Sequence, residues 1–288
     1  MKKDLQESKL FTPYQMGPVT LRNRVIRSAA FESMGKDFAP TQDLKDYHVS
    51  VARGGVGMTT LAYASINRSG VSFNSQLWLR DEIVPQLKDI TDAVHAEGAA
   101  VGIQIGHCGN MTHWSTAGSF PVSASNGFNL YSPTFHRRMS HAEIAQTAKD
   151  FGKAVYTAHE AGFDSVEVHA GHGYLISQFL SPWTNRRRDE FGGSLENRMR
   201  FMKMCLTEVM EAAAKCNMAV LVKHNMEDGF KSGIQVPESI EIAKEIEKFG
   251  VHGIVLSSGF VSRAPMAVMR GRIPTKTMGY YMGWNEWL

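Results

Sequence analysis

Short apolar runs alternate along the chain with longer segments in which apolar residues recur every three or four positions. The runs cover residues 24–30, 56–62, 99–106, 166–168, 219–224 and 252–257. The segments with helical periodicity begin at residues 41, 81, 140, 194 and 237, and nearly all of them end at a glycine just before the next run. Alternation of this kind predicts a parallel sheet with helices packed outside it.

Two folds have this alternation, the open doubly wound sheet and the closed (β/α)₈ barrel, or TIM barrel. No Gly-x-Gly-x-x-Gly sequence follows the first run, which argues against the doubly wound dinucleotide-binding fold. Polar and glycine-rich clusters follow the first, third, fourth and sixth runs. A barrel places its active site at these carboxyl ends of the strands. The sequence therefore predicts an α/β fold of the TIM-barrel type.

Six strand–helix units precede residue 260, whereas a complete barrel needs eight. Residues 260–288 contain no clear strand run and are rich in Met, Trp and Tyr, which a folded protein normally covers. We interpret them as a segment that packs under something this chain lacks. Either the sequence is a truncated product that lacks the last two units, or a partner closes the barrel. The expectation is one barrel domain over residues 1–288, incomplete at its C-terminus.

Two local signals frame the middle of the chain. The segment from His107 to Met139 lacks periodicity and is rich in Ser, Gly, Asn and Pro, so we expect a long loop there. Long loops inside compact domains are usually functional. The sequence Ser140-His141-Ala142-Glu143 has the form of a capping box, which predicts a helix start at this position.

The candidate chemistry lies where the fourth run ends, in His169-Ala170-Gly171-His172-Gly173-Tyr174. The glycines allow a sharp turn, so two imidazoles and a phenol converge at one strand end. Two imidazoles can donate to one oxygen and stabilise negative charge on it, and a phenol can deliver a proton. His169, His172 and Tyr174 are therefore the predicted catalytic residues. One alternative is a metal site made by the two histidines and His107; another is a structural histidine pair.

A metal site of this kind would need a carboxylate or thiolate as well. We place Glu167 on the opposite strand face from the histidines, so it does not serve. Two further polar residues, Gln104 and Lys223, stand in apolar runs where a polar residue is out of place. A buried Lys needs an anionic partner. In a barrel both side chains could meet a ring with amide donors and acceptors; alternatively, Lys223 reaches solvent.

Composition and charge exclude several classes of function. The net charge of +3 is too small and too scattered to indicate nucleic-acid binding. The one basic run, Arg186-Arg187-Arg188, is followed at once by Asp189 and Glu190, so we expect local pairing. No secretory signal begins the chain, and no stretch approaches the ~18 apolar residues of a membrane span. Three cysteines without a Cys-x-x-Cys motif indicate a reducing compartment, so we expect a cytoplasmic protein.

Three stretches resemble the Old Yellow Enzyme family of flavin-dependent oxidoreductases, including its 2,4-dienoyl-CoA reductase branch. They are Leu21-Arg22-Asn23-Arg24, Gln104-Ile105-Gly106-His107-Cys108-Gly109, and the run HAGHGYLISQFLSPWTNRRRDEFGGSLENRMRF from His169 to Phe201. The last is highly specific, and the resemblance covers most of the chain. It implies a TIM barrel that holds FMN at the carboxyl ends of its strands and takes reducing equivalents from NADH or NADPH.

The resemblance also implies residue roles. Ala29, Ala30 and Ala62 would lie against the flavin, Gln104 would bind its pyrimidine edge, and Lys223 would stand where many members have Arg, near N1 and O2. His169 and His172 would hold the carbonyl oxygen of a small α,β-unsaturated substrate while hydride reaches its β-carbon. Tyr174 would then protonate the α-carbon. No resident metal is implied, and the resemblance leaves a homo-oligomer open.

The sequence also departs from the family pattern. Phe31 and Glu32 stand where members commonly place a small residue near the flavin, no iron–sulfur cysteine cluster is visible, and the last two units are missing from the pattern. In many barrels those units bind the cofactor phosphate. The leading interpretation is an FMN-dependent ene reductase. The alternatives are a truncated, catalytically impaired remnant with weak or no FMN binding, and a metal-dependent barrel hydrolase.

Overall fold

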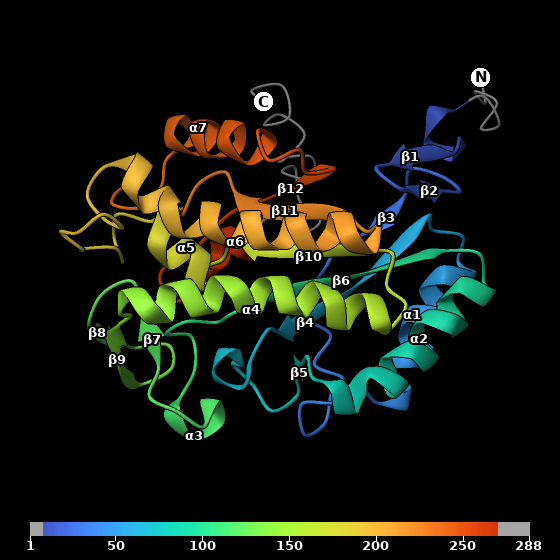
Figure 1. The fold of residues 1–288 in the computed structure, drawn as a ribbon, viewed down its shortest axis with the longest axis horizontal. Coiled ribbons are helices and arrows are strands. Elements are labelled where there is room, and N and C mark those ends of the chain that lie inside the picture. Colours follow the sequence, from blue (N-terminus) through green and yellow to red (C-terminus); the bar gives the residue numbers. More distant parts are fainter. Residues whose placement is uncertain (1–7, 270–288) are drawn as a thin grey trace.

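Six parallel strands form the central sheet of the computed structural model, which describes residues 8–269 (Figure 1). Their order across the sheet is β3 (Ile26–Arg27), β4 (Met58–Ser65), β6 (Ala100–Gly106), β10 (Ser165–Ala170), β11 (Ala219–Asn225) and β12 (Gly253–Ser257). A short strand, β5 (Leu77–Trp78), pairs with the end of β4. All of these pairings are parallel.

The strand order decides between the two folds that the sequence allowed. Each of the six main strands pairs with the one before it in the chain, so the sheet grows in one direction only. A doubly wound sheet reverses this order at a switch point, whereas a barrel does not. Lys223 on β11 also donates to the carbonyl oxygen of Ala29 just past β3, at 2.7 Å, although three strands lie between β3 and β11 in the sheet order. The sheet is therefore curled, and the predicted barrel-type fold is confirmed.

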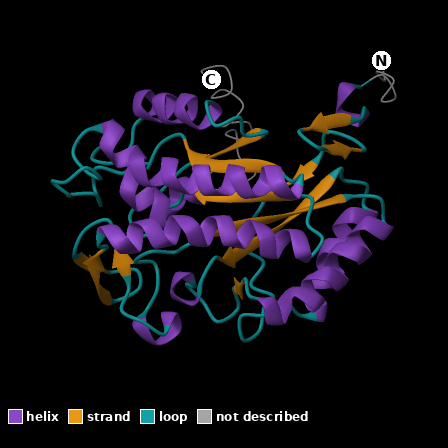
Figure 2. Cartoon of the chain, viewed as in Figure 1, coloured by secondary structure: helices purple, strands orange, loops and turns teal. Residues whose placement is uncertain are grey.

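Five helices lie outside the strands, in the places that the pattern predicts (Figure 2). They are α1 (Gln42–Arg53), α2 (Val84–Ala96), α4 (His141–Glu160), α6 (Leu195–Cys216) and α7 (Val236–Glu247). Each presents buried apolar residues to the sheet, because its apolar positions recur at helical spacing. The capping box is confirmed: the Ser140 side chain accepts from the Glu143 N–H, and the Glu143 carboxylate accepts from the Ser140 N–H. Among residues 8–269, no helix is both long and apolar enough to cross a bilayer.

A hairpin that the sequence pattern does not predict covers the amino ends of the strands. It consists of β1 (Tyr14–Met16) and β2 (Val19–Leu21), after a 3₁₀ turn at η2 (Lys9–Phe11). Met16 and Leu21 pack with Met58, Ala219 and Leu221, which lie at the amino-end half of β4 and β11. The hairpin thus seals this end of the apolar interior.

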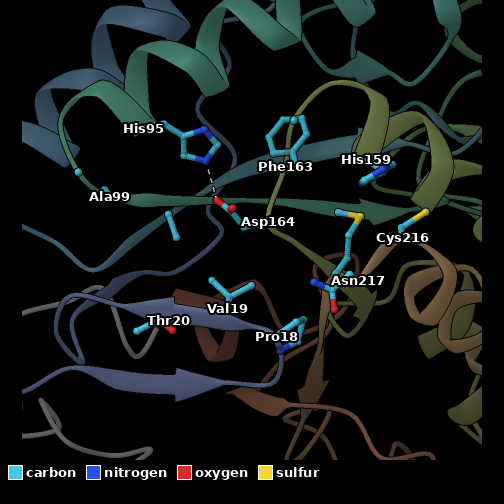
Figure 3. Close-up of a pocket in the computed structure, with 14 residues that line it drawn as sticks. Pro18, Val19, Thr20, His95, Ala99, His159, Phe163, Asp164, Cys216 and Asn217 are labelled. Carbon is cyan, nitrogen blue, oxygen red and sulfur yellow. Dashed lines mark hydrogen bonds and ion pairs between the residues drawn. The ribbon is translucent and has the colours of Figure 1, made fainter.

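A cavity of about 540 Å³ lies beside this hairpin (Figure 3). His95 from the end of α2 bonds to Asp164 just before β10, at 2.8 Å, and the same carboxylate accepts from the Val101 N–H at 2.7 Å. This carboxylate raises the pKa of His95. These contacts fix the end of α2 to the start of β6 and β10, which is a structural role. The candidate catalytic residues lie at the opposite, carboxyl ends of the strands.

The loops at the carboxyl ends hold more structure than the pattern indicates. The predicted long loop contains α3 (Trp114–Ala117), β7 (Val122–Ser123), β8 (Gly127–Asn129) and β9 (Thr134–Arg138). Three further short helices are η3 (Arg68–Gly70), η4 (Asp81–Ile83), which leads into α2, and α5 (Leu175–Leu180). α8 (Pro265–Met269) ends the described chain. The interpretation of the tail as packing under a missing part concerns mostly residues 270–288, which lie outside the described range.

Candidate active site

A cavity of about 300 Å³ opens at the carboxyl ends of the strands. Its polar wall consists of Gln104 on β6, His169 on β10, and His172 and Tyr174 in the turn after β10. Its other walls are the backbone after β3 and a group of apolar and aromatic side chains. The remaining lining residues are Ala29, Ala30, Phe31, Tyr63, Ser72, Phe73, Met111, Tyr131, Val261, Pro265 and Val268. The predicted catalytic residues therefore share one cavity.

The two histidines and the tyrosine are in mutual contact. The ring centroids of His169 and His172 are 5.0 Å apart, and those of His169 and Tyr174 are 4.8 Å apart, edge to face. The turn is possible because His172 adopts a φ of +59° and Gly173 a φ of +81°. The side-chain oxygen of Asn225 accepts from the His172 N–H at 3.1 Å, and the Ser257 hydroxyl lies 2.5 Å from His172 Nε2. The ends of β11 and β12 thus fix this turn.

Burial determines the protonation of these groups. It lowers the pKa of His169 well below its usual value, and electrostatic interactions with His172 and Lys223 act in the same direction, so His169 is neutral at physiological pH. Its Nδ1 is buried without a hydrogen-bond partner among residues 8–269. Burial raises the pKa of Tyr174 to about 12, so this phenol keeps its proton. The site therefore offers an imidazole nitrogen that lacks a partner and a protonated phenol.

Beneath the cavity lies a buried network that corrects one interpretation of the sequence. Glu167 does not face away from the histidines: its carboxylate accepts from Gln104 Nε2 at 2.6 Å and lies 3.2 Å from Lys223 Nζ. Residues two apart on a strand share a face, so Glu167 and His169 both point into the barrel. Lys223 also donates to the carbonyl oxygen of Ala29 at 2.7 Å. The anionic partner that a buried Lys needs is Glu167, and the alternative of a Lys that reaches solvent is wrong.

The cofactor residues that the resemblance implies fall into two groups. Ala29, Ala30 and Gln104 line the cavity, whereas Ala62 and Lys223 lie just behind it. The N–H of Ala62 donates to the Glu32 carboxylate at 3.2 Å. Lys223 supports the backbone at Ala29 rather than lining the cavity. Their contacts with a flavin stay predictions.

The alternative metal site of His169, His172 and His107 is not assembled. His107 does not line the cavity: its Nε2 lies 3.1 Å from the Ser69 hydroxyl, and its Nδ1 accepts from the Gly109 N–H. Within residues 8–269, the one group of His and carboxylate ligand atoms spaced for a metal ion is His141 with Asp189 and Glu190, on the surface. The three cysteines are free thiols, and burial raises the pKa of Cys108 to about 12, which makes it a poor nucleophile.

Sequence reasoning missed several residues of the cavity. Tyr63 on β4 packs beside His169 and Tyr174, with its ring centroid 6.2 Å and 5.2 Å from theirs. Phe31 stacks on Phe73 at 5.6 Å, and both are partly exposed at the cavity wall. A tyrosine inside an apolar run was a usable signal for Tyr63. No local signal marks Phe73, because its partner is 42 residues away in the chain.

Comparison with known proteins places this site in a family. The sequence profile of the NADH:flavin oxidoreductase / NADH oxidase family matches residues 9–277. The chain is 35% identical over 266 residues to a 4,4'-dithiodibutanoate disulfide reductase of Rhodococcus erythropolis, covering 92% of this chain and 66% of that protein. It is 34% identical over 272 residues to an NADPH dehydrogenase of Listeria welshimeri, covering 93% and 78%.

The fold agrees with these matches. The Old Yellow Enzyme homologue from Zymomonas mobilis superposes with a TM-score of 0.79 at 28% identity, covering 88% of this chain and 74% of that one. The chain thus spans about two thirds of the disulfide reductase and about three quarters of the other two proteins. Members of this family are flavin-dependent NAD(P)H oxidoreductases with FMN as cofactor, as the resemblance implied. The chain belongs to the NADH:flavin oxidoreductase / NADH oxidase family, the family of Old Yellow Enzyme.

Proposed function

We propose that this protein reduces the C=C bond of small α,β-unsaturated carbonyl compounds, with FMN as cofactor and NADH or NADPH as reductant. The observation that carries the proposal is the shared cavity of two imidazoles and a protonated phenol at the carboxyl ends of the strands. Few, unpaired cysteines and a nicotinamide reductant both favour the cytoplasm as the place of action.

The residues present fit a flavin. The isoalloxazine is a flat ring with an amide-like edge, and the cavity supplies small residues at Ala29 and Ala30, a side-chain amide at Gln104 and aromatic walls at Phe31 and Tyr63. The buried His169 Nδ1 without a partner also marks a place for a ligand. When bound, FMN supplies the hydride. Lys223 and Glu167 hold Gln104 and the Ala29 backbone in position for it.

His169 and His172 would bind the carbonyl oxygen of the substrate. Because burial keeps His169 neutral, it acts as a hydrogen-bond donor rather than as a cation, through the one ring nitrogen that carries a proton. Donors aimed at this oxygen stabilise the negative charge that develops there when hydride reaches the β-carbon. Asn225 holds the His172 backbone during this step.

Tyr174 would complete the reaction by protonating the α-carbon. Its pKa of about 12 keeps the phenol protonated at neutral pH, and the carbanionic carbon that accepts the proton is far more basic. The remnant interpretation is less favoured, because these three side chains converge as catalysis requires.

The first experiment is the visible absorption spectrum of the purified protein, before and after addition of FMN. Flavin bands that NADH or NADPH bleaches and an enone restores are expected. Tyr174→Phe should slow the restoration by about 10²–10⁴-fold and leave the bleaching unchanged, because the phenol acts only on the substrate carbon.

Tyr131→Phe is the matched control, since Tyr131 lines the same cavity but its ring is half exposed. It should leave both rates near those of the unsubstituted protein. A protein that stays colourless with FMN present would refute the proposed function. Equal restoration rates for Tyr174→Phe and the unsubstituted protein would refute the role of the phenol alone.

A further inference from the structure

A second cavity, of about 420 Å³, adjoins the first at the carboxyl ends of the strands. Its apolar wall contains Phe128 and Leu130 from the segment around β8, and Trp183 from the loop after α5. These side chains are exposed to an unusual degree for apolar residues, with Leu130 83% and Phe128 47% accessible. In Figure 1, β8 and α5 lie at the same end of the sheet, opposite the β1–β2 hairpin. The wall thus presents apolar surface beside the candidate active site.

Two arginines add positive charge to this apolar cavity. Arg186 donates from Nη2 to the backbone oxygen of Asn126 at 2.9 Å, and Arg263 follows β12 in the chain. Among residues 8–269, neither guanidinium forms an ion pair with a carboxylate, and no Asp or Glu lines the cavity. The expected local pairing of the basic run holds for Arg187, which binds Asp189 with two N–H groups at 2.9 Å and 2.7 Å. For Arg186 that expectation is wrong.

The two cavities flank the same three chain segments. Three chain segments contribute adjacent residues to both: Asn110 and Met111, Leu130 and Tyr131, and Val261 and Ser262, with the second cavity taking Asn110, Leu130 and Ser262. A ligand whose reacting end lies against His169 can therefore extend past these segments toward the arginines. Guanidinium groups bind carboxylates and phosphates through paired N–H donors, and apolar walls bind the carbon chain between the two ends.

We propose that the substrates of this protein carry an anionic group, a carboxylate or phosphate, on a carbon chain that extends from the reacting enone, and that Arg186 and Arg263 bind it. The inference rests on the proposed function, because it takes the histidine cavity as the place of reaction. It adds a specificity subsite: the reacting end is chosen by the histidines, and the distal end by the two arginines.

The kinetic test compares an α,β-unsaturated methyl ketone whose alkyl chain ends in a carboxylate with the methyl ester of the same compound. The unsubstituted protein should show a higher kcat/KM for the acid. R186Q and R263Q should each reduce this preference by roughly threefold to tenfold, as expected for charged contacts at a partly exposed site. R188Q is the matched control, because it removes the same charge from an exposed residue that does not line the cavity. It should keep the preference.

Three kinetic outcomes would overturn the inference. The first is an equal kcat/KM for acid and ester in the unsubstituted protein. The second is a loss of acid preference in R188Q as large as in R186Q and R263Q. The third is a raised KM for the nicotinamide cofactor in R186Q and R263Q, with the acid preference retained. The last would assign the cavity to the reductant.

Calorimetric binding of the saturated keto acid and its methyl ester separates this inference from the proposed function, since neither compound can be reduced at a C=C bond. Tighter binding of the acid that R186Q and R263Q weaken supports the anion subsite even in a protein that turns over no enone. Binding that the two substitutions leave unchanged refutes the subsite even in an active enzyme.

Discussion

The buried pair of Glu167 and Lys223 should contribute strongly to stability, although it lies beneath the active site rather than in it. The two side chains are 3% and 4% exposed, and their charged atoms are 3.2 Å apart. Lys223→Met leaves the Glu167 carboxylate buried, with the Gln104 amide as its one remaining hydrogen-bond donor among residues 8–269. Removal of one partner from a buried ion pair costs about 3–5 kcal/mol, because the remaining charge is uncompensated. We expect a loss near 4 kcal/mol, about the middle of that range.

Glu167→Gln should cost less, about 2–3 kcal/mol, because Lys223 keeps its bond to the Ala29 carbonyl oxygen and hydrogen bonds to charged groups are worth about 1.5–3 kcal/mol. The double variant removes both charges together. Its loss should be smaller than the sum of the two single losses by about 1–3 kcal/mol, the usual coupling between residues in contact.

The assay is urea unfolding followed by far-UV circular dichroism on the four proteins of this cycle. Lys88→Met is the control for loss of a lysine as such: its pair with Asp92 is even shorter than the buried pair, 2.7 Å against 3.2 Å, but more than half of each side chain is exposed. It should cost less than about 1 kcal/mol. A Lys223→Met variant no less stable than Lys88→Met, or additive single losses in the double variant, would refute the reasoning.

Three further predictions concern the turn, the pH dependence and a buried arginine. Gly173→Ala should destabilise the protein far more than Gly193→Ala. Both glycines have φ near +80°, which costs about 1–2 kcal/mol for any side chain, but a Cβ at Gly173 would lie 2.4 Å from the Phe260 ring, whereas one at Gly193 would have no atom within 4 Å. Equal melting temperatures of the two variants would contradict this. Burial lowers the pKa of His224 to about 4, so the unfolded chain takes up its proton first as the pH falls, and stability is lost between about pH 6.5 and about pH 4. His224→Gln should flatten that part of a stability–pH curve by about one proton, and an unchanged slope would count against it. Arg187→Lys should lower stability by about 3–5 kcal/mol, because one ammonium group cannot replace a buried guanidinium that binds a carboxylate and two backbone oxygens. A melting temperature equal to that of the unsubstituted protein would show that the guanidinium is dispensable.

The principal strands and helices followed from the sequence because their signals are local. A buried parallel strand is a short apolar run, and an amphipathic helix repeats every three to four residues, so each element carries its own pattern. The β1–β2 hairpin was missed because its strands have three residues each, too few to establish an alternation. The small sheet of β7, β8 and β9 was missed because β7 has two residues, β8 three and β9 five, too few to stand out inside a polar segment.

The candidate site divides in a similar way. The proposed catalytic set of His169, His172 and Tyr174 was visible because its three members lie within six residues of one another. The partner of Lys223 was not, because Glu167 is on the neighbouring strand and its orientation depends on an alternation that we assigned to the wrong face. A shift of one residue along a strand moves a side chain to the opposite face of the sheet, and so into or out of a site.

The sequence by itself determined a repeating strand–helix chain, a family and a cluster of candidate catalytic groups, since each of these is encoded in contiguous residues. Tertiary structure alone decided which side chains and backbone groups they contact. Parallel pairing in chain order brings the ends of six strands to one rim, and curling brings Lys223 to Ala29 from 194 residues away. The same curling sets Arg186 and Arg263, 77 positions apart in the numbering, on one cavity. Such contacts join segments that no local pattern links, so they exist only once the sheet has curled and brought those segments together.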